Sequence, residues 1–194
     1  MKVISKSRFK LGLECPNKLF YTGKDEYVNK KNNDPFLMAL ASGGFQIEEY
    51  ARMHYPAGVL VDGDYRTTTY EDYVAQTNEL LVRDNVVIFE AAFLVDDLFI
   101  RADILVKEGN NIKLIEVKSK SYNPNDENVF VGVQGGIVGA WKPYLFDIAF
   151  QKHVVEKCLP KAMITPYLFL ADKTKMASVD GLNQMFRVTK GGDE

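Results

Sequence analysis

Three residues of the types used in acid and metal chemistry lie near one another in the middle of the chain. Asp103 stands between apolar residues in the stretch RADIL, and twelve residues separate it from Glu116, which begins the triplet EVK. Side chains alternate between the two faces of a strand, so Glu116 and Lys118 would share one face. Two carboxylates that face each other repel unless something positive lies between them.

A divalent cation is the natural candidate for that positive charge. Mg²⁺ and Mn²⁺ prefer hard oxygen ligands and commonly use one or two carboxylates, together with water and substrate phosphate. Lys118 would then lie beside the metal, where an ammonium can orient water or offset phosphate charge. The residue types therefore indicate metal-assisted chemistry on a phosphate, provided that the chain brings Asp103 and Glu116 together.

Two turn signals, DD at 96–97 and GNN at 109–111, divide this part of the sequence into three strands. The apolar stretches between them read VVIFEAAFLVDD, LFIRADILVKEG and NIKLIEVKSKS. Short turns of this kind join antiparallel neighbours, so we expect an antiparallel three-strand meander. The second hairpin would place Asp103 near Glu116.

Helices are expected before the meander. Residues 5–23 have apolar side chains at helical spacing, and Pro16 should interrupt or restart that helix. Residues 34–56 predict a long helix, broken at Gly43–Gly44, and residues 68–84 predict a third helix.

The remaining elements complete an α/β pattern. A short strand is expected at 59–62, a helix at 140–158 and a last strand at 162–172 that joins the sheet. Helices before the meander and a helix–strand pair after it predict an α/β fold with a central mixed sheet flanked by helices.

The motif read from RAD at 101–103 and EVK at 116–118 resembles that of the PD-(D/E)XK nuclease superfamily. The resemblance implies a restriction-endonuclease-like core and metal-dependent hydrolysis of DNA. Asp103 and Glu116 would hold one or two Mg²⁺ or Mn²⁺ ions with the Val117 carbonyl, and Lys118 would position water or stabilise the developing charge. An unrelated sheet protein whose hairpin carries this pattern by chance is an alternative.

The flanking helices resemble those of the RecB-type and lambda-exonuclease-type branches, which implies exonuclease action. The stretch GGFQIEEYARMHYPAG looks like their first-helix motif, in which a carboxylate completes the metal site; Glu49 is the matching position and Glu48 its alternative. The stretch YLFDIAFQKHV resembles the helix that carries the motif QxxxY. Gln151 matches its glutamine, Val155 stands where tyrosine is usual, and Tyr144 is the alternative tyrosine.

The N-terminal stretch SKSRFKLGLECPNKLFY resembles the start of a bacterial family of RecB-like nucleases of uncharacterised function, and of CRISPR-adaptation nucleases. In those relatives a Cys-Pro supplies one iron–sulfur ligand, and three more cysteines lie near the C-terminus. Cys15 matches the first ligand, but Cys158, the other cysteine of the chain, lacks the required spacing. We therefore expect no iron–sulfur cluster in this chain, which is either the nuclease core of a longer protein or a member that has lost the cluster.

Composition and charge narrow the class of protein. With 194 residues and 46% hydrophobic content, the chain fits a single unit over 1–194, or the N-terminal part of a longer protein. No stretch approaches the roughly 20 apolar residues of a membrane helix, and the start lacks a signal-peptide core, so we expect a cytoplasmic protein. Residues 1–31 carry eight Lys or Arg against three acids although the whole chain is at −2. This basic segment could meet phosphate, or it could be a solvated helix face.

The sequence thus predicts a Mg²⁺- or Mn²⁺-dependent deoxyribonuclease whose partners are DNA and a helicase or another repair or defence protein, with no membrane partner. The alternative is a non-catalytic module that keeps the fold to bind nucleic acid or to dock a partner. Glu90, inside an apolar strand, needs a partner, for which Arg101 and a metal are both candidates. His54 and His153 are expected to be ordinary surface or core residues, although His54 follows Glu49 closely enough to approach the site.

Overall fold

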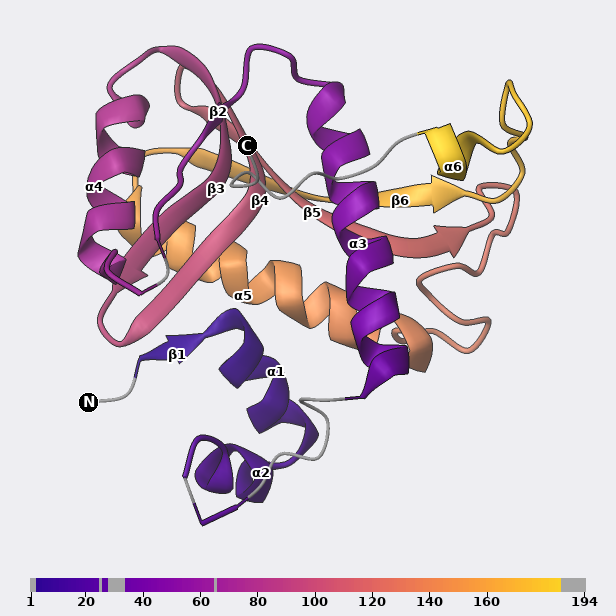
Figure 1. Cartoon of the computed structure of the whole chain (residues 1–194), viewed down its shortest axis with the longest axis horizontal. Helices are drawn as coiled ribbons and strands as arrows, with labels where there is room; N and C mark the ends of the chain where they lie inside the picture. The colour runs from indigo at the N-terminus through magenta and orange to yellow at the C-terminus, as the bar shows by residue number, and fades with distance from the viewer. Residues whose placement is uncertain (1–2, 25, 28–33, 65, 186–194) are drawn as a thin grey trace.

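The computed structural model describes residues 3–24, 26–27, 34–64 and 66–185, and it shows a six-stranded mixed sheet flanked by helices (Figure 1). The strands are β1 (Ile4–Ser5), β2 (Val59–Leu60), β3 (Asn85–Val95), β4 (Leu98–Glu108), β5 (Asn111–Tyr122) and β6 (Met163–Asp172). The helices are α1 (Lys6–Glu14), α2 (Pro16–Tyr21), α3 (Pro35–Met53), α4 (Tyr70–Leu81), α5 (Lys142–Cys158) and α6 (Leu182–Met185), with a 3₁₀ turn η1 (Gly139–Trp141). The predicted α/β class with a mixed sheet is confirmed.

The centre of the sheet is the predicted meander. Strands β3, β4 and β5 pair antiparallel in sequence order, while β2 joins β3 and β6 joins β5 in parallel. Asp96 (φ 51°) and Gly109 (φ 58°) adopt the left-handed backbone conformation at the two turns. Aspartate and glycine are among the residues that tolerate this conformation, which explains why these short loops stand where the chain reverses.

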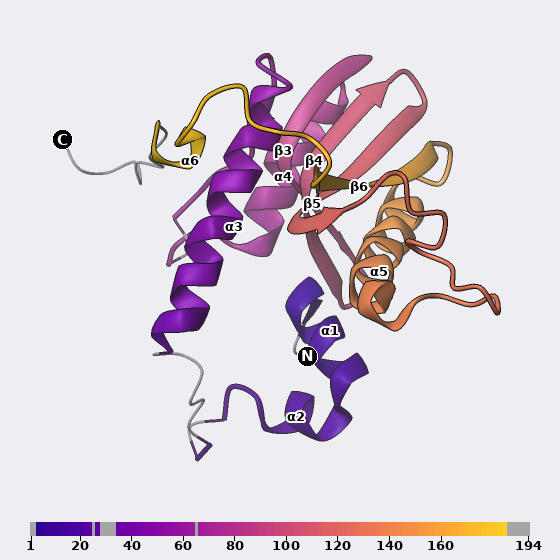
Figure 2. The ribbon, with the colours of Figure 1, turned by 90° about the vertical axis from the view of Figure 1, so that its right-hand side faces the viewer.

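Helices cover both faces of the sheet, and each face has its own apolar cluster. Helices α4 and α5 pack on the face that holds the larger cluster, which includes Ile88, Leu105 and Leu114. Helix α3 packs on the opposite face, where Ala51 contacts a smaller cluster around Ile104. Figure 2 shows α3 and α5 on opposite sides of the sheet. A side chain on β5 therefore faces either α5 or α3 according to its position in the strand.

The N-terminal segment joins the sheet at the start of β4. The backbone N–H of Ile4 donates to the carbonyl of Asp97 at 2.7 Å, and β1 runs parallel to the first residues of β4. Ser5 caps α1 by accepting a bond from the N–H of Arg8, and Pro16 begins α2 as predicted. The pairing of β1 with β4 was absent from the expected elements, and it fixes where α1 begins.

Helix α3 runs without interruption through Gly43–Gly44, so the predicted break is wrong. A glycine inside a helix costs only about 1 kcal/mol relative to alanine, and packing of the following turns offsets such a cost. Ala51 is fully buried and Ile47 packs beside it against the sheet. In the described part of the chain, no helix has both the length and the apolar character needed to cross a membrane.

Candidate functional site

Three carboxylates lie at one level across the three central strands. The β3–β4 register pairs the residues on either side of Glu90 and Asp103 but leaves these two unpaired. The β4–β5 pairing begins one residue after Asp103 on β4 and ends one residue before Glu116 on β5. By register, Glu90 therefore lies opposite Asp103, and Asp103 lies opposite Glu116, at a level where the backbone ladder is interrupted.

The backbone of β3 agrees with this interruption. Glu90 has a φ of 57°, which is uncommon for a residue other than glycine. The unpaired level on β3 therefore coincides with a residue in the left-handed backbone conformation.

The side chain of Asp103 supplies a hydrogen bond at the level where the backbone pairing of β4 with β5 is interrupted. Its Oδ2 accepts the backbone N–H of Val117 at 2.8 Å, so a side chain of β4 replaces a backbone acceptor for β5. The other oxygen, Oδ1, is directed to the Nζ of Lys6 at 3.1 Å. Asp103 is thus held by two different partners, and the hairpin brings it beside Glu116 as the sequence predicted.

The positive group between the two carboxylates is Lys6, the first residue of α1. Its Nζ lies 3.0 and 3.2 Å from the two oxygens of Glu116, in addition to its contact with Asp103. Glu116 is fully buried, and the side chain of Lys6 is 24% exposed. The requirement for a cation between the acids was predicted, but the contribution of Lys6 was missed because it lies 97 residues from Asp103 in the sequence.

The two carboxylates differ in their electrostatics. Burial acts to raise the pKa of Glu116, but the ammonium groups of Lys6 and Lys118 outweigh it and lower that pKa to about 2. Burial raises the pKa of Asp103 to about 6, with repulsion from Glu116 acting in the same direction and Lys6 opposing it. Burial alone would lower the pKa of Lys6, yet the surrounding carboxylates raise it well above its ordinary value. Glu116 is therefore the firmly ionised member of the pair.

Lys118 shares the face of Glu116, as expected from the alternation along β5. Its ammonium bonds to Glu116 Oε1 and lies 3.6 Å from Oδ2 of Asp147 on α5. Burial and the charge of Glu116 raise the pKa of Asp147. Asp147 is fully buried and was not among the predicted site residues. Its spacing of one helical turn from Gln151 is the sequence signal that could have found it.

Gln151 joins α5 to the same cluster. Its Nε2 donates to Glu116 Oε2 at 2.6 Å and contacts Asp147 Oδ1 at 3.5 Å. The side chain is fully buried, and among the described residues no group bonds to its Oε1. A buried amide oxygen without a partner is costly, so Oε1 is an acceptor that an additional donor such as a water molecule would satisfy.

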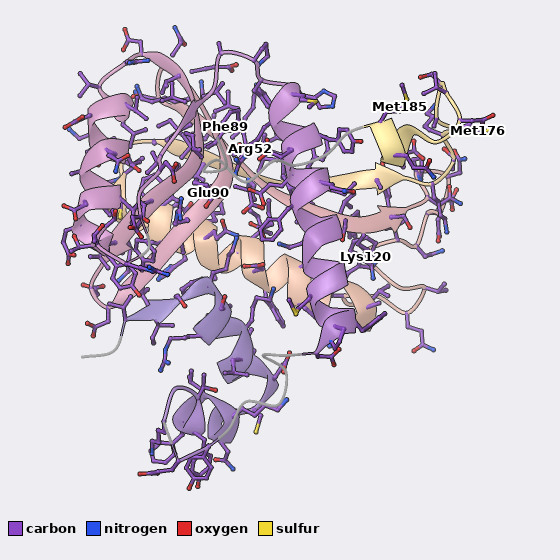
Figure 3. The ribbon with its side chains drawn as sticks, viewed as in Figure 1. Arg52, Phe89, Glu90, Lys120, Met176 and Met185 are labelled. Atoms are coloured by element: carbon purple, nitrogen blue, oxygen red, sulfur yellow. The ribbon has the colours of Figure 1, made fainter. Side chains whose placement is uncertain are left out.

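A second group of charges surrounds Glu90, at the contact between β3 and α3. Glu90 pairs with Arg52 of α3 at 3.3 Å and with Arg101 of β4 at 3.2 Å. Arg52 also bonds to Glu48 and, at 3.0 Å, to Glu49. Arg52 and Glu90 are drawn in Figure 3, near the junction of α3 with the sheet. Arginine is thus the partner that the structure gives to Glu90.

Among the predicted metal ligands, Glu49 is the one whose surroundings fit that role least. Its side chain is 44% exposed, and its ion pair in the described residues is with Arg52. Over the same residues, no three or more His, Cys, Asp or Glu side chains are grouped as metal ligands. The assignment of Glu49, or of its alternative Glu48, as a third ligand therefore stays a prediction.

Substitution of Glu90 by glutamine is expected to reduce the pH dependence of stability. Burial raises the pKa of Glu90 from 4.5 to about 7 in the folded chain. A raised pKa contributes stability that is fully present below about pH 4.5 and is lost as the pH rises through about 7. The free energy of unfolding of the wild type should thus fall between pH 5 and pH 8, and Glu90→Gln should remove the part of that fall that belongs to Glu90, on the order of 2 kcal/mol. The raised pKa of Asp103 acts in the same direction and is left in the variant.

Urea unfolding at the two pH values measures this difference. Glu49→Gln is the matched control, because it also removes a carboxylate paired with Arg52 but from a more exposed position. We expect Glu49→Gln to keep the pH dependence of the wild type. An equal change in both variants, or a wild-type pH dependence retained by Glu90→Gln, would contradict the prediction.

The other residues singled out by the sequence lie around this centre or in the core. Val155 is fully buried in the larger apolar cluster, so the residue at the usual tyrosine position is a core residue. Tyr144 packs against Trp141, with ring centroids 5.8 Å apart, and under the ammonium of Lys120. His153 is exposed on α5, and His54 packs its ring against Phe169 at 5.4 Å.

The two cysteines occupy different elements. Cys15 is half-buried at the junction between α1 and α2, where it is the residue before Pro16. Cys158 is half-buried at the end of α5, and its Sγ donates to the carbonyl of Leu94 at 3.7 Å. Cys158 thus packs at the end of the core, consistent with the apolar character of an unpaired cysteine.

No family model, curated protein or solved structure matches this chain.

Proposed function

We propose that this chain is a metal-dependent nuclease that hydrolyses phosphodiester bonds of DNA. The observation that carries the proposal is the convergence of carboxylate oxygens from Asp103 and Glu116, on adjacent strands, around a single cationic position. Lys118 lies beside them on the same strand as Glu116. Two acids and a lysine in this arrangement are suited to hold a divalent cation and to meet a phosphate.

The donor set fits Mg²⁺ or Mn²⁺. Asp103 and Glu116 supply hard carboxylate oxygens, and the Val117 carbonyl is the third predicted ligand. Gln151, which bonds to Glu116 through Nε2, also has a buried Oε1 without a partner among the described residues, an acceptor that a water molecule at the site would satisfy. When bound, such a metal would polarise the scissile phosphate and lower the pKa of a water molecule.

The side chains around the carboxylates orient them before any substrate arrives. Gln151 bonds to one oxygen of Glu116 and Lys118 bonds to the other, so both oxygens have fixed partners. Asp147 lies near both Lys118 and Gln151 and fixes the ammonium from the side of α5. In the proposed reaction, Lys118 stabilises the negative charge that develops on the phosphate oxygens.

Basic side chains near the cluster are suited to the DNA backbone. Arg8 and Lys10 follow Lys6 on α1. Lys120, labelled in Figure 3, follows Lys118 on β5, and its ammonium lies over the ring of Trp141 at 4.7 Å. Contacts of this type bind phosphate without reading sequence and weaken with salt. Of the basic segment noted in the sequence, Lys2, Lys30 and Lys31 lie outside the described residues.

One observation favours the alternative, a non-catalytic DNA-binding or partner-docking module that keeps this arrangement. Lys6 already supplies a positive charge to both carboxylates, so the cluster is electrostatically satisfied by the chain itself. A buried cluster of this kind can fix the packing of α1 against the sheet without chemistry. The alternative predicts DNA binding that needs no divalent cation and produces no cleavage.

Incubation of the purified chain with end-labelled linear DNA separates the two functions. We expect degradation of the DNA with Mn²⁺ or Mg²⁺, loss of degradation with EDTA, and its recovery when Mn²⁺ is added in excess. DNA binding should persist in EDTA and fall steeply with salt, because it depends on lysine–phosphate contacts. Retained binding with intact DNA under all metal conditions would support the non-catalytic module instead.

A further inference from the structure

Lys6 occupies the position at which the proposed function requires a metal ion. Its Nζ lies within 3.2 Å of three oxygens from Asp103 and Glu116, which are the two side chains proposed to hold the cation. Lys6 is thus a cation supplied by the chain, bound through the same oxygens that a divalent ion would need. Both cannot bind these oxygens together, because two positive charges at one position repel.

We propose that Lys6 is an autoinhibitory plug, which blocks the Asp103–Glu116 pair and leaves it when a divalent cation binds. The inference rests on the proposed function, since it requires that this carboxylate pair takes up metal. It adds that metal loading is coupled to withdrawal of the start of α1. A chain with Lys6 in place represents the closed state of the site.

The element that carries Lys6 lies at the edge of the core, where Val3, Ile4 and Phe9 pack against the larger cluster while staying only partly buried. Helix α1 has no buried side chain, and the strand before it has two residues. Its attachments to α5 are the stacking of Phe9 on Phe150, with ring centroids 4.3 Å apart, and the pair of Lys10 with Asp147 at 3.5 Å. Few buried contacts are typical of segments that open locally while the rest of a protein stays folded.

The site keeps its shape when the ammonium leaves. Asp103 remains bonded to the N–H of Val117, and Glu116 remains bonded to Lys118 and Gln151. The contacts of Lys6 are therefore additional to those that orient the carboxylates. If Lys6 served only to pack α1, its ammonium would not need to lie between Asp103 and Glu116, because other groups already orient these two carboxylates.

Calorimetric titration with Mn²⁺ tests the competition. Lys6→Met removes the charge and keeps a long apolar side chain, and we expect it to bind Mn²⁺ about tenfold or more tightly than the wild type, since an opposing cation is gone. Lys6→Arg keeps the charge and should stay within about threefold of the wild type. Lys113→Met is the matched control, because it also replaces a paired lysine but one that pairs with Glu108 at 3.3 Å, away from α1 and from the carboxylate pair, and its affinity should also be close to wild type.

The outcomes separate this inference from the proposed function. Equal Mn²⁺ affinity in Lys6→Met and the wild type, or weaker affinity in Lys6→Met, would overturn the plug and leave a metal-binding site in place. Absence of Mn²⁺ binding from both proteins would overturn the proposed function as well. Adding Glu116→Gln to Lys6→Met should abolish the tight binding, which shows that the measured ion sits at the carboxylate pair.

Amine labelling of the unmodified chain gives a second measurement that does not depend on whether Lys6→Met folds. Mass spectrometry after brief acetylation should show Lys6 protected without metal and labelled at least about threefold faster with saturating Mn²⁺, because a displaced ammonium becomes accessible and loses its carboxylate partners. Lys113, which pairs with Glu108 away from α1, serves as the internal reference. Labelling of Lys6 that Mn²⁺ leaves unchanged or slows would overturn the proposal.

Discussion

Glu116→Gln is expected to reduce metal-dependent DNA cleavage by about three orders of magnitude or more, the largest effect of any substitution considered. Glu116 is fully buried, and its pKa is lowered to about 2, so it carries its negative charge throughout the range in which an enzyme is assayed. Glutamine has the same size but no charge. It should remove most of the attraction for a divalent cation, which depends on ionised oxygen ligands.

The variant is also expected to fold. Lys6 keeps Asp103 as a partner and Lys118 keeps Asp147, so neither ammonium is left buried without an opposite charge. The loss of a buried charge should nevertheless lower the free energy of unfolding by about 3 kcal/mol, the scale of breaking a buried ion pair. Circular dichroism establishes the fold, and single-turnover cleavage with calorimetric Mn²⁺ titration establishes the loss.

Glu108→Gln is the matched control for this experiment. Glu108 lies at the end of the same hairpin, where it is exposed and pairs with Lys113 at 3.3 Å. It should cleave and bind Mn²⁺ as the wild type does. Full activity in Glu116→Gln would exclude the proposed site, and a loss of DNA binding equal to the loss of cleavage would indicate that Glu116 supports binding rather than chemistry.

Lys118→Met should leave metal and DNA affinity within a few-fold of the wild type and reduce cleavage by about two to three orders of magnitude. A protonated lysine cannot ligate a cation, and its charge opposes the binding of one nearby. Its benefit belongs to the transition state, where charge builds on the phosphate oxygens. Single-turnover cleavage and Mn²⁺ titration on the same variant separate these two effects.

Lys120→Met is the control for Lys118, because it lies two residues further along the same face of β5. Its ammonium contacts the ring of Trp141 and the carbonyl of Ala140 rather than the carboxylate pair. Cleavage by Lys120→Met at saturating DNA should stay near wild type. Loss of Mn²⁺ binding in Lys118→Met would make Lys118 a structural partner of Glu116, and unchanged cleavage would assign it no role in the reaction.

The part of the site that the sequence predicts is the part built by local connections. Asp103 and Glu116 belong to one hairpin, so the turn at 109–111 was enough to bring them together. Lys118 lies two residues after Glu116, which is the repeat of side chains on one face of a strand. Gln151 was predicted from its place in the stretch YLFDIAFQKHV. In each case the information lies within a short stretch of sequence, which is where periodicity and turn residues act.

Contacts made over long sequence separations were not predictable in the same way. Lys6 is separated from Glu116 by 110 positions, and its approach depends on the pairing of β1 with β4. A strand of two residues leaves no periodic pattern to detect. The predicted break at Gly43–Gly44 failed for a related reason: helix propensity is a local preference, and packing of the following turns against the sheet overrides it.

The bond from Asp103 to the N–H of Val117 has a consequence for the entropy of ligand binding. A carboxylate side chain that rotates freely would lose conformational entropy when it binds a cation, and this loss would cost roughly 0.5–1 kcal/mol of binding free energy. Here Oδ2 is fixed by the backbone of β5, so the rotation of the side chain is restricted as soon as the two strands pair. The side chain of Asp103 has therefore already lost this conformational entropy when the chain folds. A ligand that binds Oδ1 does not lose it again, and its binding free energy is more favourable by that amount.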